Sequence, residues 1–404
     1  MASDVVHSAP TFFFILLLLL PLGVTWVNDI LCRRHFPEHF GMFRFVFWLF
    51  SLSSTGLLLY SRLFRSVGSE WSETFHFFVN LSYVWAIGQI FLLLLLILSF
   101  LMSFLIGKCQ RLLSSPSSEA KTGLSRRNFF KITAGALPVV AFGLSAEGVY
   151  QESQELTLAR YNVPFPNLPE SLHHFKIAQI SDAHLGPFFM LDKLDEAFGL
   201  VRQEKPQLLV ITGDLIDDLG YLEKMMIKLE ALSEFIPYGI YFCWGNHEYF
   251  RNKPRIAAAF KDSAVTLLDN SSQLLFSGKR PVYLLGVDYP WSKNKGEQQQ
   301  VIQAALARAR ENVPKEAFSI LLAHHPDFLT EAFQARIPLT LSGHTHGGQV
   351  ALFGHSLLPV QYKYMRGMYQ EQGCYGYVST GAGQWLPFRL GCPAEVVFFT
   401  LLPA

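Results

Sequence analysis

The sequence predicts an α/β domain preceded by an N-terminal transmembrane helical region. Three observations support this fold class. Long uncharged runs rich in Leu and Phe are confined to the first third of the 404 residues. From about Tyr150 onward, short runs of branched and aromatic residues alternate with stretches of helical spacing. Several of those short runs end in polar residues that suit metal ions.

The composition excludes some classes of function. Half of the residues are apolar, which is high for a soluble enzyme. Lys and Arg number 33 against 32 Asp and Glu, so no excess of positive charge indicates a nucleic-acid partner. The five cysteines are widely spread and form no Cys-x-x-Cys pair. A disulfide framework or a thiolate zinc site is therefore not expected.

Three uncharged runs predict three transmembrane helices within residues 1–107: Thr11–Val27, Phe45–Tyr60 and Phe75–Gly107. A helix needs about 20 residues to cross about 30 Å of hydrocarbon. The third run has 33 residues and is long enough by itself, whereas the first two, with 17 and 16, need flanking positions. Buried helices of a soluble core are the alternative. The stretch Leu92–Leu96 argues against them because it offers no polar face to water.

Residues 108–149 are expected to form a basic linker. Between Lys108 and Lys131, six basic side chains stand against the single acid Glu119, which places this linker on the cytoplasmic side. Residues 125–131 resemble a twin-arginine export signal, and the apolar run Ile132–Ala146 follows them. As a helix of 15 residues that run is about 22 Å long. It either crosses the bilayer with help from its neighbours, or lies in the interface and leaves the rest of the chain cytoplasmic.

Residues 150–404 contain eight apolar runs that are predicted to be strands, and five stretches of helical spacing. The strands are expected at Phe175–Ile180, Leu208–Thr212, Gly239–Trp244, Val282–Val287, Phe318–Ala323, Ile337–Ser342, Tyr375–Thr380 and Val396–Leu401. The helices are expected at Leu191–Gln203, Tyr221–Phe235, Lys253–Asp262, Glu297–Glu311 and Asp327–Ala335. This alternation predicts sheets covered by helices, with functional sites at the carboxyl ends of the strands.

Seven candidate metal ligands follow the predicted strands. Asp182 and His184 follow the first run, Asp214 the second, Asn246 the third, His324 the fifth, and His344 and His346 the sixth. Taken singly, each has an ordinary explanation: an Asp can cap a helix, an Asn can form a turn, and a buried His can be satisfied by hydrogen bonds. Those explanations would have to hold independently at seven positions. A shared site is the better interpretation.

The ligand types suit the hydrolysis of a phosphate ester. Two metal ions about 3.5–4 Å apart neutralise the phosphoryl oxygens and lower the pKa of bound water toward 7. The expected ligands are Asp182, His184 and His346 for one ion and Asn246, His324 and His344 for the other, with Asp214 as the bridge. Nitrogen and oxygen ligands without sulfur suit Mn, Fe or Zn. His247 is then free to act as the general acid or as a donor to the phosphoryl group.

Together these motifs resemble the signature of the calcineurin-like metallophosphoesterases, over residues from about Phe175 to the C-terminus. The motifs are Asp182-x-His184, Gly213-Asp214, Gly245-Asn246-His247-Glu248, His324 and Gly343-His344-Thr345-His346. Residues 323–327, 343–349, 379–381 and 386–389 are similar to the bacterial YkuE/YaeI branch of that family. The resemblance implies a four-layer α/β/β/α sandwich with two divalent metal ions, of which manganese is favoured.

Three positions need separate comment. The family pattern favours His324 over the adjacent His325 as the ligand, because alternation along a strand lets only one of them face the metals. Asp217 stands where the purple acid phosphatases place a metal-bound tyrosine, so a tyrosinate–iron site is not expected. Arg389 is a candidate for binding a substrate phosphate by bidentate hydrogen bonds, with a surface ion pair as the alternative.

The prediction is a multi-pass protein of the bacterial inner membrane that hydrolyses a lipid-linked phosphodiester or pyrophosphate. Tethering at the bilayer raises the effective concentration of such substrates. The resemblance suggests UDP-2,3-diacylglucosamine of lipid A biosynthesis, which is made in the cytoplasm, so residues 132–146 must then not cross. One alternative is an exported phosphodiesterase or phosphatase acting on envelope phospholipids. Another is a non-catalytic membrane scaffold with the same fold. The oligomeric state is not predicted.

Overall fold

The computed structural model describes residues 20–34, 40–63, 71–113, 126–152, 156–292, 294–353, 355–357 and 362–404. These residues belong to two compact units, a helical unit that ends at Ser153 and an α/β unit that begins at Gln154. Each unit has its own core.

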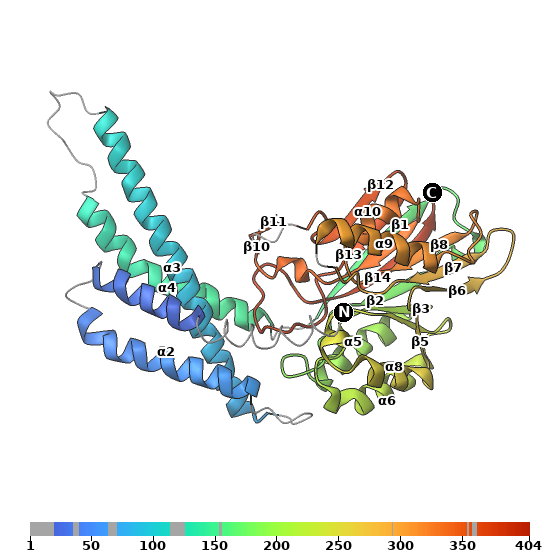
Figure 1. The fold of residues 1–404 in the computed structure, drawn as a ribbon, viewed down its shortest axis with the longest axis horizontal. Coiled ribbons are helices and arrows are strands. Elements are labelled where there is room, and N and C mark those ends of the chain that lie inside the picture. Colours follow the sequence, from blue (N-terminus) through green and yellow to red (C-terminus); the bar gives the residue numbers. More distant parts are fainter. Residues whose placement is uncertain are drawn as a thin grey trace. The chain divides into compact units, whose positions relative to one another are not determined.

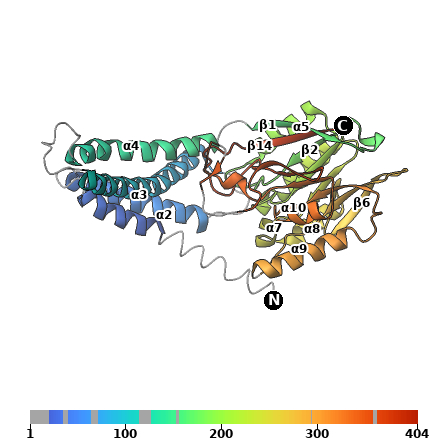
Figure 2. The same cartoon turned by 90° about the horizontal axis from the view of Figure 1, so that it is seen from above.

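The helical unit contains a helix over residues 20–34, followed by α2 (Phe40–Leu63), α3 (Glu73–Leu113) and α4 (Arg126–Glu152). In Figure 2, α2, α3 and α4 lie side by side. Among the described residues, α2 and α3 are the two helices long and apolar enough to cross a membrane, and they contain the predicted second and third spans. The predicted first span, Thr11–Val27, lies partly outside the described residues.

Most apolar side chains of α2 and α3 point outward. Only 28% of the most apolar stretch of α2 and 22% of that of α3 are buried within the unit. The core helix of a soluble protein buries its apolar face, so this exposure favours contact with lipid. The apolar part of α4, Ala136–Tyr150, is shorter than a full span.

Hydrogen bonds between polar side chains connect the helices of this unit. The Asn28 side-chain amide donates to the Gln89 carbonyl oxygen at 2.9 Å. The Gln89 amide and the Trp85 indole both donate to the Ser51 hydroxyl at 3.0 Å. Such contacts associate helices whose apolar surfaces gain little by leaving lipid.

The α/β unit is built on two six-stranded sheets. The first has the order β1 (Thr157–Phe165), β14 (Glu395–Pro403), β2 (Lys176–Ile180), β3 (Leu208–Thr212), β4 (Ile240–Cys243) and β5 (Val265–Leu267). The second has the order β12 (Gly367–Glu371), β13 (Cys374–Val378), β9 (Leu339–Ser342), β8 (Phe318–Leu322), β7 (Val282–Gly286) and β6 (Ser271–Phe276). The strands β2 to β5 are mutually parallel, as are β7, β8, β9 and β13.

Helices cover the outer face of each sheet, as Figure 1 shows. The first sheet is covered by α5 (Leu191–Glu204), α6 (Leu222–Ser233) and α8 (Lys253–Lys261), and the second by α9 (Lys295–Ala309) and α10 (Phe328–Gln334). Between the sheets lies an apolar core that includes Val210, Leu284, Ile320 and Phe399. The predicted four-layer α/β/β/α sandwich is therefore confirmed. Because the central strands are buried on both faces, they read in the sequence as continuous apolar runs.

Candidate metal centre

The candidate ligands lie at one edge of the unit, where the carboxyl ends of parallel strands from both sheets meet. One buried side chain connects the two sheets at this edge. The Gln179 amide on β2 donates to the Thr212 hydroxyl on β3 at 2.8 Å and to the Ser342 carbonyl oxygen on β9 at 2.9 Å. These bonds fix the relative position of the loops that follow the three strands.

Five of the candidate ligands have left-handed backbone conformations. Their φ angles are 51° at Asp182, 49° at His184, 50° at Asp214, 75° at His344 and 49° at His346. For a residue other than glycine such a conformation costs about 1–3 kcal/mol and persists where the surroundings enforce it. Hydrogen bonds between the loops do so here, for example from the Asp182 N–H to the Gly213 carbonyl oxygen at 3.1 Å.

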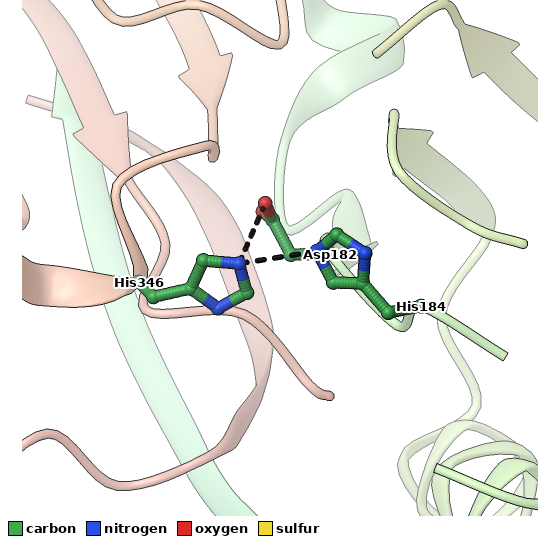
Figure 3. A group of neighbouring side chains, drawn as sticks. All are labelled: Asp182, His184 and His346. Carbon is green, nitrogen blue, oxygen red and sulfur yellow. Dashed lines mark hydrogen bonds and ion pairs between the residues drawn. The ribbon is translucent and has the colours of Figure 1, made fainter. Parts of the chain in front are cut away.

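The first group of ligands comprises Asp182, His184 and His346, whose ligand atoms lie within 4.8 Å of one another. Figure 3 shows the two imidazoles and the carboxylate pointing toward one another. The Nε2 atoms of His184 and His346 are 3.1 Å apart, and His346 Nε2 is 3.5 Å from Asp182 Oδ1. Ligands about 2.0–2.2 Å from a common ion would lie at about these separations from one another.

The second group comprises Asp214, His324 and His344. His324 Nε2 is 3.2 Å from Asp214 Oδ2 and 3.3 Å from His344 Nδ1. The same Oδ2 atom of Asp214 is 3.7 Å from His184 Nε2 in the first group. The Asp214 carboxylate therefore faces both groups, as a bridging ligand must.

The outer nitrogens of two histidines contact oxygen atoms. His324 Nδ1 is 2.7 Å from the Thr212 carbonyl oxygen, and His344 Nε2 is 3.1 Å from the Tyr362 hydroxyl. A carbonyl oxygen can only accept, so His324 carries a proton on Nδ1, and Nε2, on the side of Asp214, is the nitrogen that would bind a metal ion. An outer hydrogen bond of this kind orients metal-binding histidines in general.

Asn246 supplies a further oxygen. Its side chain is buried, and within the described part of the chain its Oδ1 atom has no hydrogen-bond partner. The following N–H, that of His247, donates to Asp214 Oδ1 at 2.8 Å, so Asn246 lies beside the bridging carboxylate. A buried carbonyl oxygen without a donor indicates a missing partner. With the imidazoles and carboxylates, this oxygen fits two divalent cations.

Burial and mutual charge govern the protonation of the site. Burial raises the pKa of Asp182. Burial would also raise the pKa of Asp214, but the neighbouring histidines, His324 first, hold it well below its usual value. Burial alone would lower the pKa of His324, yet the Asp214 and Asp182 carboxylates raise it to about 10. Burial holds the pKa values of His344 and His346 well below 6.5, so both present neutral imidazoles.

The candidate general acid, His247, is held by Asp217. His247 Nδ1 is 2.7 Å from Asp217 Oδ1, and Asp217 Oδ2 is 3.6 Å from His184 Nδ1. Burial would lower the pKa of His247, but the carboxylates, Asp217 first, raise it to about 9. Asp217 therefore orients the imidazole and favours its protonated form. Sequence reasoning did not assign Asp217 this role, although its position three residues after Asp214 was a usable signal.

Glu248 connects two of the ligand-bearing loops and was also not assigned a role from the sequence. Its fully buried carboxylate accepts hydrogen bonds from the N–H groups of Asp214 at 3.1 Å, Leu215 at 2.7 Å and Gly245 at 3.0 Å. Gly245 is required there because a Cβ atom would lie 2.1 Å from Asp214 Oδ1. Glu248 thus joins the loop after β3 to the loop after β4.

Arg389 occupies a different environment from the one expected for a phosphate-binding residue. Its side chain is 1% exposed. The guanidinium donates to Gln384 Oε1 at 2.7 Å and to the carbonyl oxygens of Thr380 at 2.8 Å and Gly383 at 2.6 Å. Its Nη2 atom is also 3.3 Å from His346 Nδ1. These contacts favour support of the loop beside His346 over the predicted contact with a substrate phosphate.

His325 lies beside the second group of ligands. Its ring packs against Tyr289 and Tyr362, and its Nδ1 atom accepts a hydrogen bond from the Asp327 N–H at 3.2 Å. Burial lowers the pKa of His325 to about 3. Because Nδ1 is used in the turn before α10, the geometry favours His324 as the ligand.

Comparison with known proteins identifies the family. Residues 175–356 match the calcineurin-like phosphoesterases. The chain is 30% identical to the metallophosphoesterase YkuE of Bacillus subtilis over 290 residues, which cover 69% of this chain and 98% of the relative. It therefore belongs to the calcineurin-like metallophosphoesterase family and is a metal-dependent phosphoesterase.

Two further relatives cover more of the chain. An uncharacterised metallophosphoesterase of Campylobacter jejuni is 27% identical and covers 96% of this chain and 98% of its own length. A protein of Danio rerio named transmembrane protein with metallophosphoesterase domain is 30% identical and covers 74% of this chain and 70% of its own length. Together with the exposed apolar helices, the likeness to the Danio rerio protein indicates an association with the membrane.

We predict that Glu248→Ala lowers the affinity for metal about 10- to 100-fold, as loss of an orienting contact typically does. Three buried N–H groups lose their acceptor, so the loops after β3 and β4 can move apart. Calorimetric titration of the metal-free protein with Mn²⁺ measures the change in affinity. The exposed Glu311→Ala is the matched control and should bind as the wild type does. Equal affinities in the two variants would contradict this role.

We also predict that Asp217→Asn lowers kcat about 100-fold through the orientation and protonation of His247, within the range of general acid catalysis. If the pair acts as a unit, Asp217→Asn adds little to the loss caused by His247→Asn. Steady-state kinetics on the two single variants and the double variant, at equal metal content, tests this. Multiplicative losses in the double variant would show that the two residues act independently.

Proposed function

We propose that this metallophosphoesterase is anchored in a membrane and hydrolyses phosphodiester or pyrophosphate bonds of a lipid-linked substrate at a two-metal site. The observation that carries the proposal is the position of the Asp214 carboxylate between two groups of ligands. One ion is assigned to Asp182, His184 and His346, and the other to Asn246, His324 and His344, with Asp214 shared. Manganese is the metal we favour among Mn, Fe and Zn.

The residues around this site have separable roles. When bound, two divalent ions supply charge neutralisation at the phosphoryl group and acidify a water near neutral pH. Asp214 would be shared by the two ions, and Asn246 would add a carbonyl oxygen to the second. His247 keeps Nδ1 on Asp217, so Nε2 is the atom that gives a proton to the leaving oxygen. The direction of the raised His247 pKa supports this role.

Attachment to the membrane supports a lipid-linked substrate. The apolar surfaces of α2 and α3 favour a multi-pass protein, and we assign it to the bacterial inner membrane. A phosphoesterase held at the bilayer meets amphiphilic substrates at a high effective concentration. The particular substrate we propose is UDP-2,3-diacylglucosamine, cleaved to UMP and the lipid monophosphate. This choice rests on the resemblance of the motifs.

Two other functions compete with this one. An exported phosphodiesterase or phosphatase acting on envelope phospholipids would use Arg126 and Arg127 as an export signal. A non-catalytic scaffold would keep the fold without hydrolysis. Against the scaffold, every candidate ligand lies at the same edge, together with the pair of His247 and Asp217.

Activity separates the enzyme from the scaffold. We expect the full-length protein, reloaded with Mn²⁺ in detergent, to hydrolyse bis(4-nitrophenyl) phosphate. Asp214→Ala should lower kcat/KM at least about 1000-fold, because both ions lose their shared ligand. The control is Asp195→Ala, which removes an exposed carboxylate on α5 and should leave the rate unchanged. A wild type as inert as Asp214→Ala would establish the scaffold.

The side of the membrane separates the two enzymatic functions. If the substrate is UDP-2,3-diacylglucosamine, the purified protein releases UMP from it, and a reporter fused at about residue 160 reports a cytoplasmic position. Export of that reporter would exclude this substrate, because it is made in the cytoplasm. The exported phosphodiesterase would then be the better assignment, testable with phospholipid substrates in vesicles.

A further inference from the structure

A small hairpin beside the metal centre exposes large apolar side chains. It consists of β10 (Ala351–Leu352) and β11 (His355–Ser356), which follow the Gly343–Gln349 motif directly. Leu352, Phe353 and Leu357 are 54%, 93% and 60% exposed. Three such side chains close together on a surface are unusual unless the surface contacts another apolar phase.

The hairpin is fixed to the loop that carries His344 and His346. Its first strand bonds to a neighbouring segment, with the Ala351 N–H donating to the Leu390 carbonyl oxygen at 2.8 Å. Its second strand packs closely against the motif. A Cβ atom on Gly348 would lie only 2.1 Å from Ser356 Oγ. The position of the hairpin is thus set by the same segment that holds the candidate ligands.

The backbone at Phe353 is in a left-handed conformation, with φ of 49°. A bulky side chain adopts this conformation only at a cost, and such residues cluster at functional sites. In Figure 1, β10 and β11 lie at the periphery of the α/β unit, outside the two large sheets. Phe353 is therefore held exposed on the surface, although both the exposure of its apolar ring to water and its left-handed backbone are unfavourable.

The connection from the helical unit enters the α/β unit at this same edge. β1 runs parallel to β14, and β14 runs antiparallel to β2, so Thr157 at the start of β1 lies at the carboxyl end of β2. Backbone hydrogen bonds lead from there to the site: Thr157 bonds to Ala394, Glu395 to Gly381, and Ala382 to Ser181. Only residues 153–155 separate Glu152, the last residue of α4, from Leu156.

We infer that the β10–β11 hairpin contacts the lipid bilayer and inserts Leu352, Phe353 and Leu357 into its interface. A bilayer is the favoured occupant because the same chain carries two helices of membrane-spanning length and is tethered at the edge where the hairpin lies. Phe and Leu side chains are typical of segments that bury an apolar face at the boundary between headgroups and acyl chains. A lipid phosphate would then reach the metals without leaving the membrane surface. This benefit rests on the proposed function, whereas the insertion does not.

Spin-label depth measurements on the full-length protein in phosphatidylethanolamine/phosphatidylglycerol vesicles test the insertion. A Cys109→Ser background removes the exposed cysteine, since the other four are buried. Labels are attached at Phe353→Cys and, as the control, at Phe235→Cys, an exposed residue that follows α6. We expect the ratio of oxygen to water-soluble nickel accessibility to be at least about fivefold higher at 353. Equal ratios at the two positions would overturn the inference.

Kinetics provide a second readout. Leu352→Ser combined with Phe353→Ser should leave hydrolysis of the soluble diester within about twofold of the wild type. Hydrolysis of UDP-2,3-diacylglucosamine presented in vesicles should fall about tenfold, because apolar contact with the bilayer is lost. Phe235→Ser should change neither rate. Equal losses on both substrates would assign the hairpin to folding and overturn the inference. If the wild type hydrolyses neither substrate, the proposed function fails, and the label depth still decides the hairpin.

Discussion

The geometry of the candidate metal centre depends on the carboxylate of Asp214. One of its oxygens faces His184 and His324, and the other accepts the His247 N–H. Its own N–H is held by Glu248. Loops after β2, β3, β4 and β8 therefore converge on a single side chain, and this convergence requires the two sheets to keep a fixed relative position. The buried Gln179 amide helps to fix that position by bonding to one strand of each sheet.

A site of this kind is costly to the fold in the absence of cations. Asp182 and Asp214 are buried with little water to solvate them, and burying a charge without a partner costs several kcal/mol. Histidinium partly compensates, which is why the pKa of His324 rises so far. Divalent ions would supply that compensation in a stronger form and leave the imidazoles neutral. The left-handed backbone at five ligands fits the same interpretation, since strain is retained where the geometry serves binding.

The central strands could be predicted from the sequence because burial on both faces makes them uninterrupted apolar runs. The four edge strands could not. β1 contains Arg160, Asn162 and Pro164, β5 has only three residues, and β6 and β12 are partly exposed, so none of the four shows a long continuous apolar run.

Candidate ligands were predictable because each follows a buried strand in a recognisable motif. The contacts of Asp217, Glu248 and Tyr362 were not, because each depends on a partner supplied by another loop. The surroundings of Arg389 could not be predicted either. Its burial among carbonyl oxygens arises from the path of residues 380–393, and the residue type alone does not indicate that path.

Strand β1, which could not be predicted from the sequence, determines where the chain enters the α/β unit. Without β1, the chain would enter the first sheet at Lys176, the amino end of β2, which is the edge opposite the metal centre. The five residues of β2 would then separate the tether from the site by about 17 Å at 3.3 Å per residue. The nine residues of β1 run the length of the sheet in the other direction, so the connection begins at the edge of the sheet where Asp182 lies. An edge strand with a weak local signal thus places the phosphoesterase site on the same side as its tether.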